Sequence, residues 1–239
     1  MRPNAYRTPD GVGVPAVTAD EMRDVDRIAT EDLGLSLAQM VEHAGRTLAR
    51  HALEFDGGPI VVLAGGGGNG SGGLACARHL VNRGRPVTVV LDRDPADLED
   101  VAASQHGILD AMNVPVRVDA DEVPGPSLVV DALVGYGLEG TPRGTAASLV
   151  EWVNRSGADV LALDVPTGTN ATTGETPGVA IDPDRTLTLA LPKTGLDETV
   201  DEFFLGDVGI PPLVYDRLEI PSVVPFGRAF SVALERVRE

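Results

Sequence analysis

The stretch from residue 65 to residue 73 constrains the fold of this 239-residue chain more than any other. It holds seven glycines in nine residues, between an apolar run at 60–64 and a helical pattern at 74–80. Glycine can take positive φ and lets backbone amides approach a ligand closely. A helix that follows adds free N–H groups and the positive end of its dipole, which favour phosphate. We therefore expect a nucleotide-like anion to bind at this turn.

Short apolar runs alternate with helical patterns along the rest of the chain. A capping box, Thr18 with Glu21, begins one expected helix, and further helices are expected at 36–53, 96–112 and 146–154. The expected strands are 60–63, 86–91, 116–118, 127–133, 159–163, 185–191 and a late edge strand at 206–211. Unalternated apolar strands separated by helices pair in parallel, with both sheet faces covered. The pattern predicts one doubly wound α/β domain over 1–239, with a loose segment at 1–15.

The composition limits the partners and the compartment. Thirty-six acidic against nineteen basic residues give a net charge of −17, which disfavours nucleic acids and anionic membranes. Lys193 is the single lysine, and so acidic a surface suggests a halophilic source, with GC-rich codon bias as the alternative. One cysteine, Cys76, excludes an internal disulfide. Since no signal peptide or membrane-spanning run is evident, we expect a cytoplasmic protein.

Three aspartates follow apolar runs and are candidates for the ligand site. Asp131 and Asp164 each end an expected strand and precede a glycine-containing loop, so both should emerge beside the glycine turn. For either alone, a helix cap is the simpler alternative. Asp92 ends the strand after the glycine turn and is either a ribose-binding acid or, more simply, a turn cap.

Other chemistries are not supported by the sequence. No Gly-Lys-Ser/Thr follows the turn, which excludes a Walker loop, and Asn69 breaks the nucleophile-elbow pattern around Ser71. The four histidines share no metal-ligand spacing. Lys193 has no evident tyrosine partner, which argues against a plain dehydrogenase.

Taken in order, these segments resemble the YjeF N-terminal domain family, whose enzymatic members are NAD(P)H-hydrate (NAD(P)HX) epimerases. The resemblance covers nearly the whole chain. It is carried by TADEM at 18–22 with Asp26, MVEHAG at 40–45, GLACARHL at 73–80, DALVGYG at 131–137, LDVPTGTN at 163–170 and GDVGIP at 206–211.

The resemblance implies a fold, a reaction and partners. The fold is a three-layer α/β/α sandwich of Rossmann type with a mostly parallel sheet and N-terminal helices. The reaction interconverts the R and S forms of NADH or NADPH hydrated at C6 of the nicotinamide ring, for cofactor repair. A separate ADP- or ATP-dependent dehydratase would then consume the S form. A potassium ion and a homodimer are also implied.

The same resemblance assigns residues by position. A potassium site would use Asn69, Asp131 and Thr167, whose oxygens suit a hard cation. Asp131 is our candidate for acid–base work at the substrate hydroxyl. The substrate would contact Asp164 and two glycine-containing loops, formed by Gly68, Asn69, Gly70, Ser71 and Gly72, and by Gly135, Tyr136, Gly137, Leu138, Glu139, Gly140 and Thr141.

The glycine turn departs from the family pattern at two positions. Gly68 replaces an asparagine, and Gly72 replaces an aspartate that would lie beside the start of the helix. The loss of a carboxylate makes the phosphate pocket less negative but puts catalysis in question. The alternative to an epimerase is therefore a catalytically impaired nucleotide-binding or scaffold domain.

Overall fold

The computed structural model describes residues 1–120, 123, 125–196, 202–221 and 224–237, and within them eight strands form the main sheet. Their order is β10-β9-β8-β7-β6-β3-β4-β5. Neighbours from β5 to β9 are parallel, and only β10 runs antiparallel, beside β9. The strands are β3 (Ile60–Ala64), β4 (Val87–Leu91), β5 (Val116–Arg117), β6 (Leu128–Ala132), β7 (Asp159–Leu163), β8 (Arg185–Leu189), β9 (Glu202–Gly206) and β10 (Ser231–Ala233).

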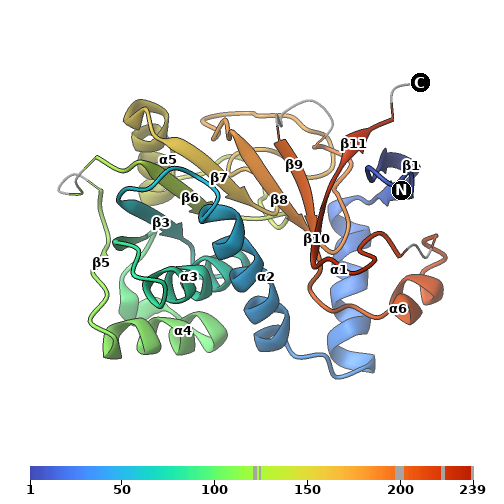
Figure 1. Ribbon diagram of the computed structural model, residues 1–239, viewed down its shortest axis with the longest axis horizontal. Helices are drawn as coiled ribbons and strands as arrows, with labels where there is room; N and C mark the ends of the chain where they lie inside the picture. Colours follow the sequence, from blue (N-terminus) through green and yellow to red (C-terminus); the bar gives the residue numbers. More distant parts are fainter. Residues whose placement is uncertain (121–122, 124, 197–201, 222–223, 238–239) are drawn as a thin grey trace.

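Helices cover both faces of this sheet, which confirms the three-layer α/β/α fold (Figure 1). The side chains of Ile60 and Val62 pack with α2 (Leu37–Ala52), α3 (Gly68–Val81) and α4 (Asp100–Ala111). Those of Val61 and Leu63 point the other way, toward α5 (Gly144–Ser156). Successive side chains of a strand alternate between faces, so a wholly apolar β3 requires both layers.

The first helix begins as its capping box predicts. The hydroxyl of Thr18 accepts from the Glu21 backbone N at 3.2 Å, and the Glu21 carboxylate accepts from the Thr18 N at 2.8 Å. This helix, α1 (Ala19–Arg27), continues into a π-helical turn, η1 (Ile28–Asp32). It brings Asp26 to the carboxyl edge of the sheet, where the pocket described below lies.

The expectation of a loose start is wrong. Strand β1 (Arg2–Arg7) pairs on one side with β2 (Gly13–Ala16) and on the other with β11 (Glu235–Arg236), in a second sheet of order β11-β1-β2. Tyr6 is 2% exposed, with its ring 5.2 Å from that of Phe203. One partner, β11, comes from the far end of the chain, so no local pattern could reveal the pairing of β1 with it.

Several expected boundaries shift, and one strand is misplaced. The edge strand expected at 206–211 is wrong: β9 ends at Gly206, and the chain then turns with Gly209 at φ +83°. Asp207 Oδ1 accepts from the Gly209 N at 2.8 Å, and α6 (Pro212–Arg217) follows. The helix expected at 96–112 divides into a 3₁₀ turn, η2 (Pro95–Asp97), and α4.

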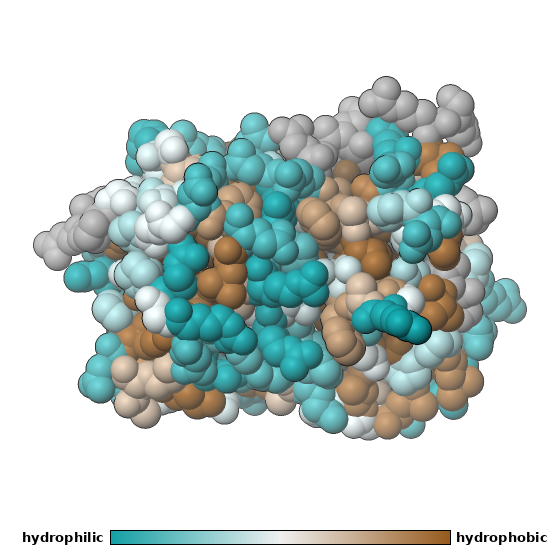
Figure 2. Space-filling view, in the orientation of Figure 1, coloured by the Kyte–Doolittle hydropathy of each residue, from teal (hydrophilic) through white to brown (hydrophobic). Residues whose placement is uncertain are grey.

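The visible surface is largely hydrophilic. Figure 2 shows hydrophilic side chains over much of one face, with smaller hydrophobic groups between them. Within the described ranges, no helix combines the length and apolar character needed to cross a membrane.

Candidate functional site

A pocket of about 520 Å³ lies at the carboxyl edge of the sheet. Its wall is formed by α1, α2, the β3–α3 turn and the segments that follow β4, β6, β7 and β8. Ligands of doubly wound sheets bind at this edge, and the volume is that of an ordinary ligand pocket. The topology thus brings the glycine turn and the expected aspartates toward one crevice.

The glycine-rich stretch is mostly helix rather than loop. Helix α3 begins at Gly68, and the Ser71 N donates the first intrahelical bond, to the Gly67 O at 2.9 Å. The amides of Gly68 and Asn69 come before that bond, and both residues line the pocket. The positive end of the α3 dipole therefore points at the pocket, an arrangement that favours an anion there.

Close packing explains the remaining glycines of this stretch. A Cβ on Gly70 would lie 1.7 Å from the Gly65 O, and one on Gly72 would lie 2.9 Å from Leu163 Cδ2. A Cβ on Gly68 would meet nothing closer than Leu37 Cδ1, at 3.7 Å. Among the described residues, those at 70–72 therefore pack inside the protein and do not line this pocket.

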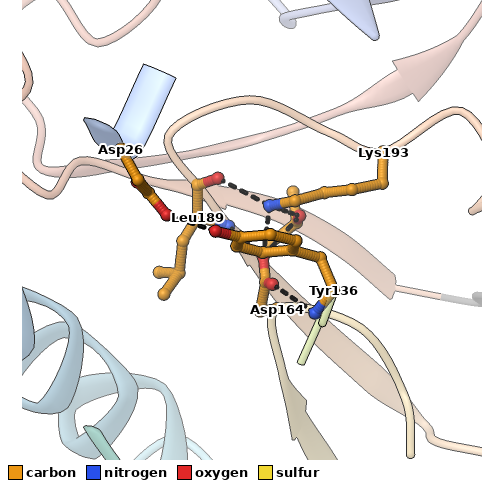
Figure 3. Close-up of polar contacts among 6 residues, drawn as sticks. Asp26, Tyr136, Asp164, Leu189 and Lys193 are labelled. Atoms are coloured by element: carbon orange, nitrogen blue, oxygen red, sulfur yellow. Dashed lines mark hydrogen bonds and ion pairs between the residues drawn. The ribbon is translucent and has the colours of Figure 1, made fainter. Parts of the chain in front are cut away.

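Asp164 is the carboxylate held most firmly at the pocket (Figure 3). It follows β7 with φ +68°, a left-handed conformation that costs a non-glycine residue energy and is typical of functional sites. Its Oδ2 accepts from the Tyr136 N at 3.1 Å, and its Oδ1 accepts from the Leu189 N at 3.2 Å and from Lys193 Nζ. These bonds link the segments after β6, β7 and β8.

Lys193 is buried beside Asp164 and is a site residue that sequence reasoning missed. Its side chain is 1% exposed, and Nζ also donates to the Leu189 O at 2.9 Å. Nζ lies 5.6 Å from the centre of the Tyr136 ring, so the lysine does have a tyrosine neighbour. The sequence feature that could have identified it is that Lys193 is the single lysine of a chain whose other basic residues of this kind are arginines.

Tyr136 joins a second carboxyl group to this cluster. Its hydroxyl donates to Asp26 Oδ2, and both residues line the pocket (Figure 3). Burial raises the pKa of Asp26, while the bond from Tyr136 and the charge of Lys193 lower it in part. Burial and the neighbouring Asp26 raise the pKa of Tyr136. In the sequence, Asp26 belonged to a helical pattern and to the first segment of the family resemblance, but neither assigned it a role in the site.

Asp131 lies beneath the pocket and is 0% exposed. Its Oδ1 accepts from the Thr167 hydroxyl at 2.7 Å and its Oδ2 from the Thr167 N at 2.8 Å. The Leu133 N adds a third bond, at 3.2 Å. Burial raises the pKa of Asp131 to about 6, against the effect of these bonds. In the described part of the chain, neither Asp131 nor Thr167 lines the pocket.

The second predicted loop divides between two hollows. Gly135, Tyr136 and Gly137 line the main pocket. The next three residues line a neighbouring hollow of about 350 Å³ that shares Tyr136 with the main pocket; they are Leu138, Glu139 and Gly140. Thr141 lies farther along, close enough to Gly178 that a Cβ there would be 2.9 Å from Thr141 Cγ2.

The charges around the pocket are balanced, in contrast to the acidic chain. Three carboxylates, from Asp26, Asp92 and Asp164, face three cationic side chains, from Arg23, Arg93 and Lys193. Among the described residues, no group of three His, Cys, Asp or Glu side chains is arranged to hold a metal ion.

This fold and pocket define a Rossmann-type α/β protein with a ligand site at the carboxyl edge of its sheet. The chain belongs to the YjeF-related protein N-terminus family, whose model matches residues 37–195. The solved structure of yeast ynu0 (YNL200c) superposes with a TM-score of 0.80 over 94% of this chain and 100% of that one; at 21% identity, it supports the fold.

Curated relatives extend the match beyond the family model. An NAD(P)H-hydrate epimerase of Dehalogenimonas lykanthroporepellens is 43% identical over 96% of this chain and 96% of that protein. One from Levilactobacillus brevis is 35% identical over 85% of this chain and 97% of that protein. A bifunctional NAD(P)H-hydrate repair enzyme of Salinibacter ruber is 39% identical over 85% of this chain, which spans 42% of that longer protein.

Proposed function

We propose that this protein is an NAD(P)H-hydrate epimerase, an isomerase that interconverts the R and S forms of NADHX and NADPHX. One observation carries the proposal: a single pocket joins the free amides at the start of α3 to the buried Asp164–Lys193 pair. The amides suit the substrate diphosphate, and the buried pair suits polar groups of the hydrated ring. The relatives named for this activity match almost the whole chain.

The Asp26–Tyr136 pair is our candidate for the proton transfer. Inversion at C6 requires the hydroxyl to leave as water and a water molecule to add from the other face. With Asp26 protonated, the hydrogen bond between the two side chains would reverse: Asp26 would donate to the Tyr136 hydroxyl, which would donate to the leaving hydroxyl while the ring nitrogen forms a double bond to C6. Asp26 is then negative beside a cationic ring, which it stabilises, and it recovers the proton when water adds.

We assign Asp131 to the floor of the site rather than to proton transfer. Its oxygens are held by Thr167 and Leu133, and none of its surface is exposed. It ties the segment after β6 to the segment after β7. A fixed floor keeps the pocket groups in place, which is a positioning role.

We further propose a potassium ion between Asn69 in the pocket wall and the two residues beneath the pocket, Asp131 and Thr167, whose chemistry fits it. The Thr167 hydroxyl lies 2.7 Å from the Asp131 carboxylate and 3.3 Å from the Val134 O, so oxygen donors gather there. Asn69 Nδ2 is buried without a hydrogen-bond partner among the described residues. Rotating this amide by 180° would offer its oxygen instead. Asn69, Asp131 and Thr167 would hold the ion, whose charge would neutralise the buried carboxylate.

The test is a direct assay of epimerisation. Purified protein is mixed with R-NADHX or R-NADPHX, and the S form is followed by chromatography, in potassium and in a buffer free of alkali metals. We expect conversion well above the spontaneous rate, and faster conversion in potassium. No acceleration over the spontaneous rate would defeat the proposal. A chain that binds its substrate without turnover would instead be the impaired domain considered above.

Product use and assembly follow from the same proposal. A dehydratase driven by ADP or ATP would consume the S form; the bifunctional name of one relative supports such coupling. We also propose that the protein is cytoplasmic and forms a homodimer. Light scattering of the purified protein measures its oligomeric state.

A further inference from the structure

The end of the pocket opposite Lys193 holds a charged pair with a defined orientation. Arg93 Nε donates to Asp92 Oδ1 at 2.8 Å, and Nη2 donates to Asp92 Oδ2 at 3.2 Å. The Asp92 side chain is 10% exposed, and that of Arg93 is 44% exposed. The carboxylate is therefore the inner partner, and the guanidinium is the partner presented to a ligand.

The Asp92–Arg93 pair packs against the glycine turn. A Cβ on Gly66 would lie 2.6 Å from Arg93 Cζ, and one on Gly65 would lie 3.5 Å from Asp92 Oδ2. Asp92 is anchored from below, because its backbone N donates to the Ala64 O at 3.2 Å. The guanidinium thus lies next to the amides at the start of α3, where we place the diphosphate.

The strand order decides which half of a dinucleotide reaches Arg93. Along the carboxyl edge the order is β7, β6, β3, β4, with Asp164 after β7 and Arg93 after β4. Three strand spacings separate them, about 14 Å. With the hydrated ring at Asp164 and the diphosphate at α3, between them, the adenosine ribose falls at Arg93.

We propose that Arg93 binds the 2′-phosphate of the adenosine ribose, so that the protein prefers NADPHX to NADHX. This inference deepens the proposed function and rests on it. The bonds to Asp92 use Nε and Nη2 and leave Nη1 for an acceptor, and a guanidinium matches phosphate well. Asp92 is already paired with Arg93, so it serves to hold the guanidinium rather than to accept from a ribose hydroxyl.

The experiment compares two ligands that need no turnover. Calorimetry on the full chain measures the binding of ADP-ribose and of 2′-phospho-ADP-ribose, each to wild type, Arg93→Ala and Arg83→Ala. Arg83 is a matched control, because it lies beyond the opposite end of α3 and its removal changes the net charge equally. We expect wild type and Arg83→Ala to bind the 2′-phosphate form at least tenfold more tightly, and Arg93→Ala to lose that preference.

Assays with both hydrates complete the test. The ratio of kcat/KM for NADPHX to that for NADHX should fall at least tenfold in Arg93→Ala and stay at the wild-type value in Arg83→Ala. Equal binding of the two ADP-ribose ligands by wild type, or binding of neither, overturns the inference. A binding preference that depends on Arg93, in a protein without epimerase activity, would support the subsite and defeat the proposed function instead.

Discussion

Lys193 donates to Asp164 in the wall of the pocket, and both side chains are almost completely buried. Such a pair does not by itself show stability, because burying two charges costs about as much as their attraction returns. The pair instead positions Asp164: Lys193 holds one oxygen of its carboxylate, and the Tyr136 N holds the other. A strained Asp164 backbone is maintained by these bonds.

Replacing the lysine tests this arrangement. We expect Lys193→Met to destabilise the protein by about 3–5 kcal/mol, because Asp164 becomes a buried charge without a partner. Chemical denaturation measures the loss. The double variant Lys193→Met with Asp164→Asn should recover part of that stability without recovering activity. Equal stability of wild type and Lys193→Met would contradict the buried pair.

The proton source predicts a pH dependence. Burial raises the pKa of Asp26, and the active form is the protonated one. Activity should therefore decline as the pH rises through that pKa. Asp26→Asn should lower kcat by about 10²–10⁴-fold and abolish this decline. Asp24→Asn, on the exposed side of the same helix, is the control and should behave as wild type. An unchanged profile in Asp26→Asn would remove Asp26 from the mechanism.

Two substitutions at Thr167 test the role of its hydroxyl, because valine removes the hydroxyl and serine keeps it. Thr167→Val loses the 2.7 Å bond to Asp131 and leaves a buried carboxylate oxygen short of a donor. We expect a loss of about 1–3 kcal/mol in stability and the loss of any potassium effect on the melting temperature. Thr167→Ser keeps the hydroxyl and should retain both. Potassium stabilisation that survives in Thr167→Val would place the ion elsewhere.

Restoring the family residue at position 68 and at position 72 should have different effects on stability. A side chain at residue 68 has open space, whereas one at residue 72 meets Leu163 Cδ2 at 2.9 Å inside the protein. Gly68→Asn should therefore fold normally. Gly72→Asp should destabilise by several kcal/mol, because it buries an unpaired carboxylate in apolar surroundings. Thermal unfolding of both variants checks this, and a stable, more active Gly72→Asp would show that the loop lacks its acid.

His51 predicts how stability changes in acid. It is 2% exposed, bonds to Ser231 Oγ at 3.1 Å, and burial lowers its pKa to about 4. The unfolded chain binds this proton near pH 6.5, so the contribution is complete above that pH and is lost as the pH falls toward 4. Between pH 7 and pH 4, the free energy of unfolding of wild type should fall by up to about 3 kcal/mol more than that of His51→Gln. An equal fall in the free energy of unfolding of wild type and His51→Gln between these pH values would contradict this.

The sequence predicted the layers and the place of the site because those depend on local patterns. Apolar runs such as 60–64 mark buried parallel strands, and the glycines before Leu74 mark a close backbone approach. Strand ends then locate Asp131 and Asp164 at one edge. The fold class, the glycine turn at the pocket and the family resemblance were all accessible at that level.

The roles of individual side chains depended on packing between distant segments. Asp26 meets Tyr136 across 110 positions of the chain, and Lys193 meets Asp164 across 29. No local spacing encodes such contacts, so the sequence gave Lys193 no partner and assigned Asp26 no role in the site. Nor can a sequence show that Asp131 is enclosed by Thr167, because burial is set by whatever else packs above a residue.

The sequence by itself determined the strand–helix alternation, the start of α3 at the glycine turn and the edge where the aspartates emerge. The tertiary structure alone decided which of those aspartates reaches the pocket, what each one binds, and that residues 2–7 pair with the far end of the chain. The physical reason is that strand order and burial are properties of the assembled sheet. Hydrophobic patterning dictates that strands pack, but neighbouring side chains dictate which carboxylate stays accessible.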